Sequence, residues 1–575
     1  MKKTYDVWKN HPALDSDLKT AMEHMGEAEI EDAFYKPLEF GTGGMRGKMG
    51  PGTNRMNVHT LKKAAYGFAK YVIEHEPDAK RRGIVIAYDN REHSDTFAWA
   101  AASVIAACGM RAFVFEHMRP TPLLSFAVRH QGAAGGIVIT ASHNPPEYNG
   151  FKIYDADGCQ LVPRLADQVV ENVEAIEDVF AVPSMDTDEA RENGLIAVLG
   201  RDIDDAYLNE VATVPMRPEA KKTITIVFTP LHGACREIGL RALTEAGYDV
   251  VTVEEQMVPD SRFSTVKSPN PEDASAFEYA IKYGRQHKAD VLIATDPDGD
   301  RLGLGVLHQG EYVFLTGNQT GAIFIESILD HHKRLGTMPE HGIVYNTIVT
   351  SDFGAAIAHT YGVEVQSTLT GFKFIGERMK AIESTQKSFL MGYEESYGYI
   401  VKDFVRDKDA VQAMVFASDI ANRLKTKGKT LVDYLHDLYE KYGTYREKNI
   451  NLTLDGKAGE AKIKAIMSHF RDLMPKSIAK RAVITIEDYL KSLRYEGGNE
   501  HIIDLPKSNV IKFSLEGDAW FVLRPSGTEP KLKIYIAVKA ASITEADTTL
   551  RTLEEAIMEI VHDAPEADHH KDVKQ

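Results

Sequence analysis

The amino-acid sequence predicts an α/β fold that is repeated three times and followed by a smaller α+β unit. Short, β-branched apolar runs alternate with helical patterns over most of the chain. Such continuous apolar strands are typical of sheets that helices cover on both faces. The last stretch instead has closely spaced strands with short turns. The length agrees with this division, because 575 residues at about 150 residues per domain give roughly four domains.

The first unit contains three predicted strands, and an Ala-rich helix lies between the first two. Ser94 is a suitable N-cap for that helix, because its hydroxyl can accept a hydrogen bond from an unpaired backbone amide. The predicted strands are 83–89, 111–116 and 135–140.

The same alternation continues through the second and third units. In the second, the predicted elements are strand 224–230, a helix near 236–246, strand 248–253, a helix near 273–287 and strand 290–295. In the third, they are strands 342–350 and 363–368, a helix near 374–384 and strand 388–392.

The C-terminal unit has strands at 509–515, 519–525 and 531–540 and a closing helix at 543–561, which favours an antiparallel sheet. Polar stretches near 182–205, 316–326 and 443–460 are the candidate seams between units. We therefore expect domains at 1–204, 205–322, 323–448 and 449–575.

The charge and cysteine content narrow the class of protein. A net charge of −17 argues against nucleic acid or an anionic membrane as a partner of the whole surface. Three cysteines without a CxxC pair favour a reduced, cytoplasmic protein. No signal peptide is expected, and the apolar run Phe97 to Met110 is shorter than the roughly 18 residues of a membrane span.

Five segments carry candidate chemistry, and the first is a glycine-rich loop at residues 40–57. It fails as a P-loop, because Thr42 and Met49 stand where glycine and a hydroxyl residue are needed. It also fails as a dinucleotide fingerprint, because Arg46 occupies the third glycine position. A mobile loop is the plain alternative; otherwise Arg46 and Arg55 are available to bind phosphate.

The second segment, TASHNPPEYNGFKIY at 140–154, follows a buried strand directly. Ser142 therefore lies at a strand end, where open α/β sheets place their chemistry. A hydrolase nucleophile elbow is excluded, because Thr140 and Asn144 occupy its two glycine positions. Ser142 is a candidate nucleophile or phosphate carrier, with His143 and Lys152 near it in sequence; a capped turn is the structural alternative.

The third segment, ATDPDGDRLG at 294–303, brings three alternating carboxylates into one tight turn after a buried strand. Asp296, Asp298 and Asp300 can converge on one hard cation, and we favour Mg²⁺. A solvated acidic turn without a metal is the structural alternative. An EF-hand is excluded, because Arg301 and Leu307 stand where Gly and Glu are required.

The last two segments supply polar groups that are weaker signals alone. GYEESYGY at 392–399 offers Glu394 and Ser396 to a polyol, or is simply an acidic helix start. RPSGTEPKLKIY at 524–535 combines a guanidinium, two hydroxyls and an open backbone, which fits a phosphate dianion as well as a plain turn.

Taken together, in this order and spacing, the five segments resemble the α-D-phosphohexomutase superfamily over roughly residues 38 to 540. The most specific matches are TASHNP followed by NGFKI, then DPDGDR and RPSGTEP. Within the superfamily, the chain looks most like bacterial α-phosphoglucomutases of the longer subgroup that also contains phosphopentomutase-type members. The resemblance implies three α/β domains with mixed sheets and a fourth, α+β domain resembling the TATA-binding-protein fold, all around one cleft.

The resemblance also implies roles for individual residues. Ser142 would carry the phosphoryl group and would hold one Mg²⁺ per chain together with Asp296, Asp298 and Asp300. Lys152 and His143 match proton-handling and phosphate-contacting positions. The remaining matches are basic cleft positions (Arg46, Arg301, Lys408), sugar contacts (Thr370, Gly371, Glu394, Ser396) and the loop for the non-reacting phosphate (Arg524, Ser526, Gly527, Thr528).

The implied function is an isomerase of carbohydrate metabolism that interconverts glucose 1-phosphate and glucose 6-phosphate through glucose 1,6-bisphosphate. Pentose phosphates and then mannose phosphates are the alternative substrates. The residue types at Tyr393 and Pro297 differ from those of many relatives in the family. A metal-dependent phosphatase fits less well, because Asp300 stands where its motif needs Thr or Val. A non-catalytic sugar-phosphate-binding protein would not need Ser142. Sugar phosphates are the expected partners, and the choice between monomer and dimer is open.

Overall fold

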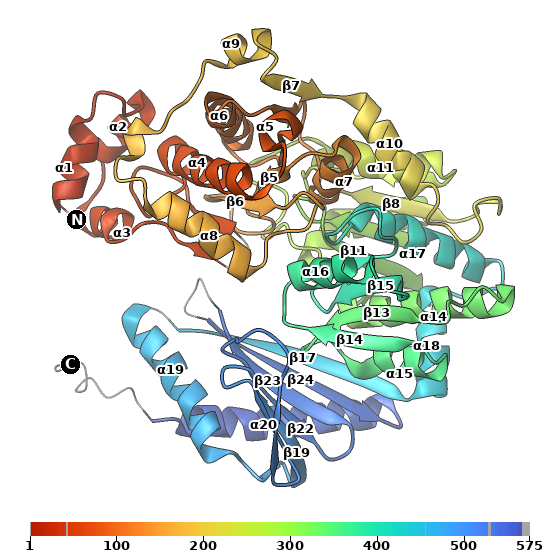
Figure 1. Ribbon diagram of the computed structural model, residues 1–575. Coiled ribbons are helices and arrows are strands. Elements are labelled where there is room, and N and C mark those ends of the chain that lie inside the picture. Colours follow the sequence, from red (N-terminus) through yellow and green to blue (C-terminus); the bar gives the residue numbers. More distant parts are fainter. Residues whose placement is uncertain (1, 42–43, 455, 527–530, 566–575) are drawn as a thin grey trace. The chain divides into compact units, whose positions relative to one another are not determined.

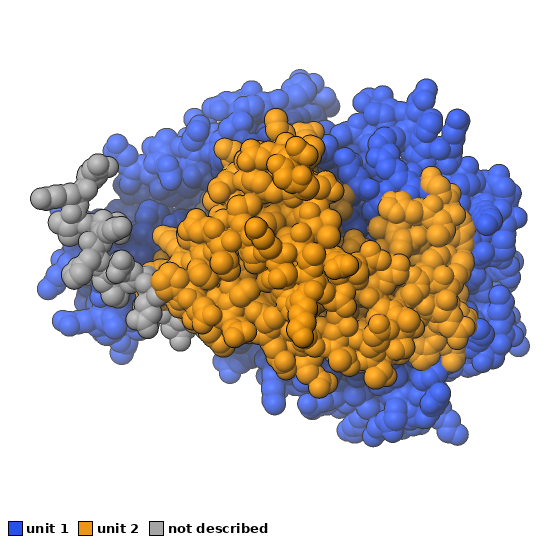
Figure 2. All heavy atoms as spheres, turned by 90° about the horizontal axis from the view of Figure 1, so that it is seen from below, with its two compact units in different colours: residues 1–346, 363–366, 371–432 blue, residues 347–362, 367–370, 433–575 orange. Residues whose placement is uncertain are grey.

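The computed structural model describes residues 2–41, 44–454, 456–526 and 531–565 (Figure 1). The chain divides into two compact units (Figure 2). The first comprises residues 1–346, 363–366 and 371–432, and the second comprises residues 347–362, 367–370 and 433–575. No helix within the described ranges combines the length and the apolar character that crossing a membrane requires.

The first sheet is mixed and runs in the order β1-β2-β6-β5-β3-β4-β7. Strands β5, β3, β4 and β7 are parallel, whereas β6 is antiparallel to both β5 and β2. Both β3 and β5 are buried along their whole length, as expected for apolar strands between helices. The strands are β1 (Phe40–Gly41), β2 (Gly44–Lys48), β3 (Ile84–Tyr88), β4 (Ala112–Phe115), β5 (Gly135–Ile139), β6 (Tyr148–Tyr154) and β7 (Ile196–Leu199).

Helices cover this sheet and share its apolar core. Side chains of α4, α6 and α8 join one cluster with the strands, while α7 packs on β3 and β5. Ser94 lies one residue after the observed N-cap, His93. The helices are α4 (Val58–His75), α5 (Ala79–Arg82), α6 (Ser94–Ala107), α7 (Thr121–Gln131), α8 (Pro163–Glu174), α9 (Thr187–Glu192) and α10 (Arg201–Val211).

Two smaller mixed sheets follow. One has the order β12-β11-β10-β8-β9 and the other β14-β13-β15-β16. Their strands are β8 (Thr225–Thr229), β9 (Asp249–Thr252), β10 (Val291–Thr295), β11 (Leu302–His308), β12 (Glu311–Leu315), β13 (Gly342–Thr347), β14 (Glu364–Thr368), β15 (Ser388–Glu394) and β16 (Gly398–Ile400). The helices of this region are α11 (Cys235–Glu245), α12 (Glu254–Met257), α13 (Glu278–His287), α14 (Gly317–Leu335), α15 (Asp352–Thr360), α16 (Phe372–Ile382), α17 (Ala410–Lys425) and α18 (Leu431–Tyr442).

The C-terminal sheet is antiparallel, in the order β17-β24-β23-β22-β19-β20-β21, with β18 paired to β19. Helices α19 (Gly456–Leu473) and α20 (Ile543–Asp563) contribute Phe470 and Ile557 to the core that it shares with Phe513 and Phe521. Its strands are β17 (Thr444–Thr453), β18 (Ser477–Ile478), β19 (Arg481–Asp488), β20 (Leu493–Glu496), β21 (Asn499–Ile502), β22 (Ile511–Leu515), β23 (Ala519–Pro525) and β24 (Lys531–Ala540).

The predicted α/β class with a C-terminal α+β unit is confirmed, and the likeness of that unit to the TATA-binding-protein fold stays a prediction. The expected division into four domains stays a prediction; its boundaries fall at 204/205 in α10, 322/323 in α14 and 448/449 in β17. The polar residues near the second boundary cap and pack the start of α14: Thr316 is its N-cap, and Asn318, Gln319 and Thr320 are buried. In α10, Ile203 and Tyr207 are buried, and the acidic Asp204 between them is buried as well, paired with Arg119.

Three N-terminal helices are a further difference from expectation: α1 (Lys2–Asn10), α2 (Ser16–Glu23) and α3 (Glu27–Phe34). They enclose a small core around Trp8, Met22 and Phe34, against which Phe180 packs. Strand 342–350 is also shorter than predicted and ends at Thr347, where the Thr350 hydroxyl accepts a hydrogen bond from the Thr347 amide and closes a turn.

Candidate active site

Ser142 lies just beyond the end of β5, in the turn that leads to β6. It is 4% exposed, and its backbone is in the left-handed region, with φ of +50°. Its Oγ donates a hydrogen bond to Asp296 Oδ2 at 2.8 Å and lies 3.3 Å from His143 Nδ1. The serine is thus directed at the acidic loop that follows β10.

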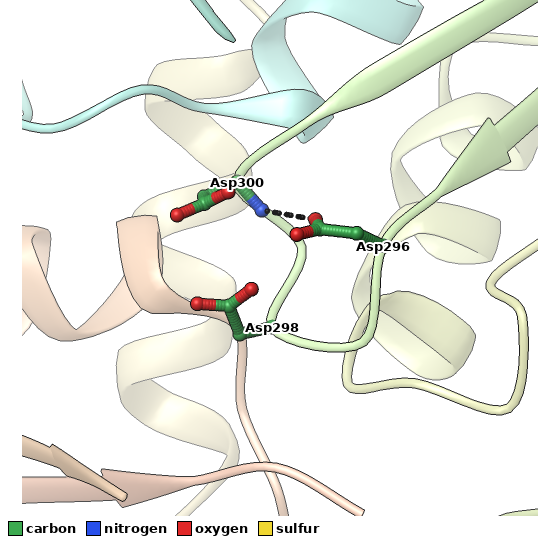
Figure 3. A group of neighbouring side chains, drawn as sticks. All are labelled: Asp296, Asp298 and Asp300. Carbon is green, nitrogen blue, oxygen red and sulfur yellow. Dashed lines mark hydrogen bonds between the residues drawn. The ribbon is translucent and has the colours of Figure 1, made fainter. Parts of the chain in front are cut away.

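That acidic loop joins β10 to β11 and carries Asp296, Asp298 and Asp300, each at most 1% exposed. Figure 3 shows the three side chains around one turn, with the backbone N–H of Asp300 donating to Asp296 Oδ1 at 3.1 Å. Gly299, with φ of +68°, allows the chain to turn back between the second and third aspartates.

The donor set of this loop fits a hard divalent cation. One oxygen from each aspartate lies within 4.8 Å of the others. Asp298 Oδ1 and Asp300 Oδ1 are buried and accept no hydrogen bond from the residues that the structure describes. Buried carboxylate oxygens without donors are costly, and Mg²⁺ prefers such oxygen ligands.

Two lysines balance part of this buried negative charge. Lys152 Nζ on β6 lies 2.6 Å from Asp298 Oδ2 and 3.5 Å from Asp300 Oδ2, and Lys408 Nζ lies 2.9 Å from Asp300 Oδ2. Burial alone would lower the pKa of each lysine, but the neighbouring carboxylates raise both. Both side chains therefore remain ammonium ions in this arrangement.

The pKa values of Asp296 and Asp298 are shifted in opposite directions. The pKa of Asp296 is raised well above its usual value, first by burial and then by the charges of Asp300 and Asp298. Burial would also raise the pKa of Asp298, but Lys152 lowers it below the usual range. Asp298 further accepts a hydrogen bond from the Thr121 hydroxyl at 3.0 Å. The cluster still carries more carboxylates than ammonium groups beside it.

Of the two arginines in the glycine-rich loop, only Arg46 reaches the serine loop. Strand β2 pairs with β6, and Arg46 Nη1 donates to Asn144 Oδ1 at 2.7 Å. Arg55 instead donates to Asp32 Oδ2 at 2.6 Å, so helix α3 engages the second guanidinium expected to be available for phosphate.

The segment after β15 also reaches the acidic loop. Arg301 forms a β-bridge to Gly398 and an ion pair with Glu272. Glu394 is 4% exposed, and its pKa is raised by burial against the opposing effects of Lys408 and Arg301. The neighbouring Ser396 also opposes this rise in the pKa of Glu394. Glu394 thus lies among the cations that border the aspartates.

Tyr393 and Pro297, which differ from the residues of many relatives, both make structural contacts. Tyr393, 1% exposed, packs against Gly321 of α14, where an added Cβ would lie 2.3 Å from its ring. Alternation along β15 places Tyr393 and Glu394 on opposite faces. Pro297 accepts a hydrogen bond at its carbonyl from Ala234 N, at 2.8 Å.

The remaining predicted residues are placed as follows. Gly371, with φ of +116°, is the N-cap of α16, and the preceding Thr370 has a buried hydroxyl. In the second unit, Arg524 Nη1 donates to Tyr535 Oη at 3.3 Å, and Ser526 N donates to Lys531 O at 2.7 Å. Gly527 and Thr528 lie outside the described residues.

The structure also brings to this site several residues that were not predicted from the sequence. Asp89 and Arg91 follow β3 and contact the serine loop, Thr121 begins α7, and Glu272 pairs with Arg301. Their position after a buried strand was the available signal for Asp89 and Arg91, as it was for Ser142.

Four consecutive parts of the chain match one family of domains. Residues 37–180, 205–309 and 316–442 match alpha/beta/alpha domains I, II and III of the phosphoglucomutase/phosphomannomutase family, and residues 450–546 match its C-terminal domain.

Individual proteins resemble the chain over similar lengths. A phosphoglucomutase of Staphylococcus aureus (strain MRSA252) is 37% identical over 536 residues, which cover 92% of this chain and 94% of the relative. One from Staphylococcus haemolyticus (strain JCSC1435) is 36% identical over 523 residues, covering 88% and 91%. In fold, a crystal structure of a putative phosphomannomutase from Thermus thermophilus is similar, with a TM-score of 0.68 at 22% identity, covering 92% of this chain and 99% of that one. The chain therefore belongs to the phosphoglucomutase/phosphomannomutase family, as its motifs predicted, and is an isomerase of the phosphohexomutase class.

Proposed function

We propose that this enzyme is a phosphoglucomutase that interconverts glucose 1-phosphate and glucose 6-phosphate through a phosphorylated Ser142. The observation that carries the proposal is the 2.8 Å hydrogen bond from Ser142 Oγ to Asp296, in a buried loop with two more aspartates. A serine beside a buried acidic cluster whose charge the lysines balance only in part is an arrangement suited to phosphoryl transfer assisted by a metal. The names of the relatives at 36–37% identity support glucose phosphate as the substrate.

The reaction would proceed in two transfers. In the first, the bond between Ser142 Oγ and phosphorus breaks while a free hydroxyl oxygen of the sugar monophosphate bonds to phosphorus, and the loss of the hydroxyl proton is balanced by a proton gained at Ser142 Oγ. The glucose 1,6-bisphosphate then reorients in the site, and its other phosphoryl group is transferred to Ser142. Because both transfers use one serine, the sugar must bind in two orientations.

The residues around Ser142 would serve these transfers through charge and proton position. Lys152 keeps its proton beside Asp298 and would balance charge on the moving phosphoryl group. His143 Nδ1, at 3.3 Å from Ser142 Oγ, is placed to exchange a proton with it. Asp296, Asp298 and Asp300 would hold Mg²⁺ together with a phosphoserine oxygen. When bound, this ion would neutralise charge on the transferred group.

The remaining site residues would recognise the substrate. Arg46, Arg301 and Lys408 would attract its anionic groups, and the acceptors on Glu394 and Ser396 would bind sugar hydroxyls. Thr370 and Gly371 would also contact the sugar. Arg524, Ser526, Gly527 and Thr528 would bind the phosphate that is not being transferred. Phosphate and hydroxyl contacts on separate loops meet the need for two binding orientations.

Turnover of three sugar phosphates tests the substrate. We expect the highest kcat/KM for glucose 1-phosphate, above ribose 1-phosphate and mannose 1-phosphate, with Mg²⁺ and glucose 1,6-bisphosphate present. A higher kcat/KM for the pentose would reassign the enzyme as a phosphopentomutase. Release of inorganic phosphate in place of isomerised sugar phosphate would identify a phosphatase.

Ser142→Ala tests the phosphoserine. We expect turnover to fall by at least about 10³-fold, because the group that carries the phosphoryl is removed. Intact mass should show one added phosphoryl group on the wild type, and none on the variant, after incubation with glucose 1,6-bisphosphate. Ser103→Ala is the matched control, because Ser103 is also a buried serine but donates to Met185 O, away from the acidic loop. Substantial turnover by Ser142→Ala would contradict the mechanism.

A further inference from the structure

Arg91 is a buried arginine whose guanidinium binds the serine loop by its backbone. Its Nη2 donates to the carbonyls of Ser142, at 2.7 Å, and of Asn144. Its Nη1 donates to the carbonyls of Pro145, at 2.8 Å, and of Tyr148, at 2.9 Å. One side chain, which is 0% exposed, thus connects four carbonyls of the loop that carries the proposed phosphoserine.

Asp89 connects this arginine to the strand that precedes the loop. Its carboxylate lies 3.4 Å from Arg91 Nε and accepts a hydrogen bond from Thr140 Oγ1 at 2.6 Å. Thr140 Oγ1 in turn accepts a hydrogen bond from the backbone N–H of Ser142 at 2.8 Å. The N–H and the C=O of Ser142 are therefore both held by a single network.

Such restraint is needed because Ser142 is in the left-handed backbone region, with φ of +50°. A residue with a Cβ persists there only where its surroundings fix it. The same turn aims Ser142 Oγ at Asp296, so its conformation and its chemical role are coupled. Releasing the carbonyl of Ser142 would let the loop relax and would turn Oγ away from the acidic cluster.

We propose that Arg91 is a positioning residue for phosphoryl transfer, which holds Ser142 in its strained orientation by binding four carbonyls of the 142–148 loop. This role rests on the proposed function of Ser142. A guanidinium can do this because its donors lie in one plane on separate nitrogen atoms and reach several acceptors at once. The three donors of a lysine ammonium are all on one nitrogen atom and span a smaller distance.

The chain offers a matched control in Arg82. Its guanidinium donates to the carbonyls of Gly132 and Ala133, at 2.9 Å each, and pairs with Glu76 at 3.1 Å. These carbonyls precede β5, whereas Ser142 follows that strand. Arg82→Ala therefore removes a similar set of hydrogen bonds from the opposite end of the same strand.

The first test compares the kinetics of Arg91→Ala, Arg91→Lys and Arg82→Ala. We expect kcat to fall at least about 100-fold in Arg91→Ala and about tenfold in Arg91→Lys, with the KM for glucose 1-phosphate within about threefold of wild type. Arg82→Ala should keep kcat within about threefold. Wild-type kcat in Arg91→Lys, or an equal loss in Arg82→Ala, would overturn the positioning role.

The second test is chemical rescue. A cavity of about 600 Å³ lies beside Asp89, Arg91, His93, Arg119 and Arg236; because the Arg91 side chain is 0% exposed, rescue requires that Arg91→Ala opens its space to this cavity. Methylguanidinium should raise kcat of Arg91→Ala at least about tenfold above an equal concentration of NaCl, and should leave Arg82→Ala unchanged. An equal response in both variants would contradict the role.

A third measurement is independent of turnover. Amide hydrogen exchange in residues 140–150 should become faster in Arg91→Ala and stay at the wild-type rate in Arg82→Ala. Unchanged exchange in Arg91→Ala would overturn the inference even if activity were lost. Absence of mutase turnover in the wild type would overturn the proposed function instead, and the exchange data would still decide whether Arg91 holds the loop.

Discussion

Asp409 is a single carboxyl group whose burial makes the stability of the protein depend on pH. It is 0% exposed at the N-cap of α17, and its carboxylate accepts hydrogen bonds from the amides of Val411 and Gln412 and from Tyr207 Oη. Burial raises its pKa from 3.8 to about 6, against the opposing effect of these hydrogen bonds. The native state therefore retains a proton that the unfolded chain releases.

The sign of the pH effect follows from that difference. The contribution of Asp409 to stability is complete below about pH 4 and is lost as the pH rises through about 6. Asp409→Asn mimics the protonated form and keeps an oxygen for the two amides. Relative to wild type, its free energy of unfolding should be about 1–2 kcal/mol larger, and the variant therefore more stable, at about pH 7.5 than at about pH 5. Urea unfolding of both proteins at the two pH values measures this. A gap that stays constant with pH would contradict the raised pKa.

At the scale of elements, the ends of neighbouring strands approach so closely that only glycine fits between them. Gly233 lies between β8 and α11, and an added Cβ would lie 2.5 Å from Pro297 Cα and 2.6 Å from Pro297 O. Because these are backbone atoms, the acidic loop would have to shift as a whole. The geometry of the three aspartates thus depends on a residue outside their own segment.

Gly233→Ala should therefore weaken the binding of Mg²⁺ to the aspartate loop. We expect the Mg²⁺ concentration for half-maximal turnover to rise at least about tenfold, because shifted carboxylates fit the ion less well. Gly26→Ala is the control, since a Cβ at Gly26 meets nothing within 4 Å. Titration of turnover with Mg²⁺ checks this, and an unchanged midpoint in Gly233→Ala would show that the loop tolerates the added methyl group.

The elements also show what the sequence could predict. Strands such as β3 and β5 were predictable, because their runs are apolar at every position and buried throughout. Strand β17 was predicted as a seam, because it is exposed along much of its length and gains its place by pairing with β24, about ninety residues away. A pairing across such a distance leaves no local pattern.

The candidate site divides in the same way. Ser142 and the three aspartates were predictable from their place after buried strands and from the family motifs. The role of Arg91 was not, although it also follows a buried strand, because its partners are backbone carbonyls more than fifty residues away, and a carbonyl is present at every position of any sequence. For Arg55, the residue pattern alone did not reveal that Asp32 would pair with it.

For the whole molecule, the excess negative charge and the local acidic cluster make different predictions about cations. A net charge of −17 attracts any cation to the surface, and salt screens that attraction. Three buried aspartates, with one oxygen of each within 4.8 Å of the others, instead form a local donor set that fits one divalent cation. An ion that binds only the native state stabilises it by about 2.7 kcal/mol at a hundred times its Kd.

Mg²⁺ should therefore raise the unfolding temperature of the wild type above the value in NaCl of equal ionic strength. In Asp296→Asn this gain should disappear, because one ligand of the ion loses its charge. With EDTA present, Asp296→Asn should unfold at the same temperature as wild type or at a higher one. The amide keeps its oxygen for the N–H groups of Asp300 and Arg301, and it removes the repulsion between the Asp296 carboxylate and its two neighbouring carboxylates. Differential scanning calorimetry under the three conditions measures this. Equal stabilisation of both proteins by Mg²⁺ would assign the effect to the acidic surface as a whole and not to the aspartate loop.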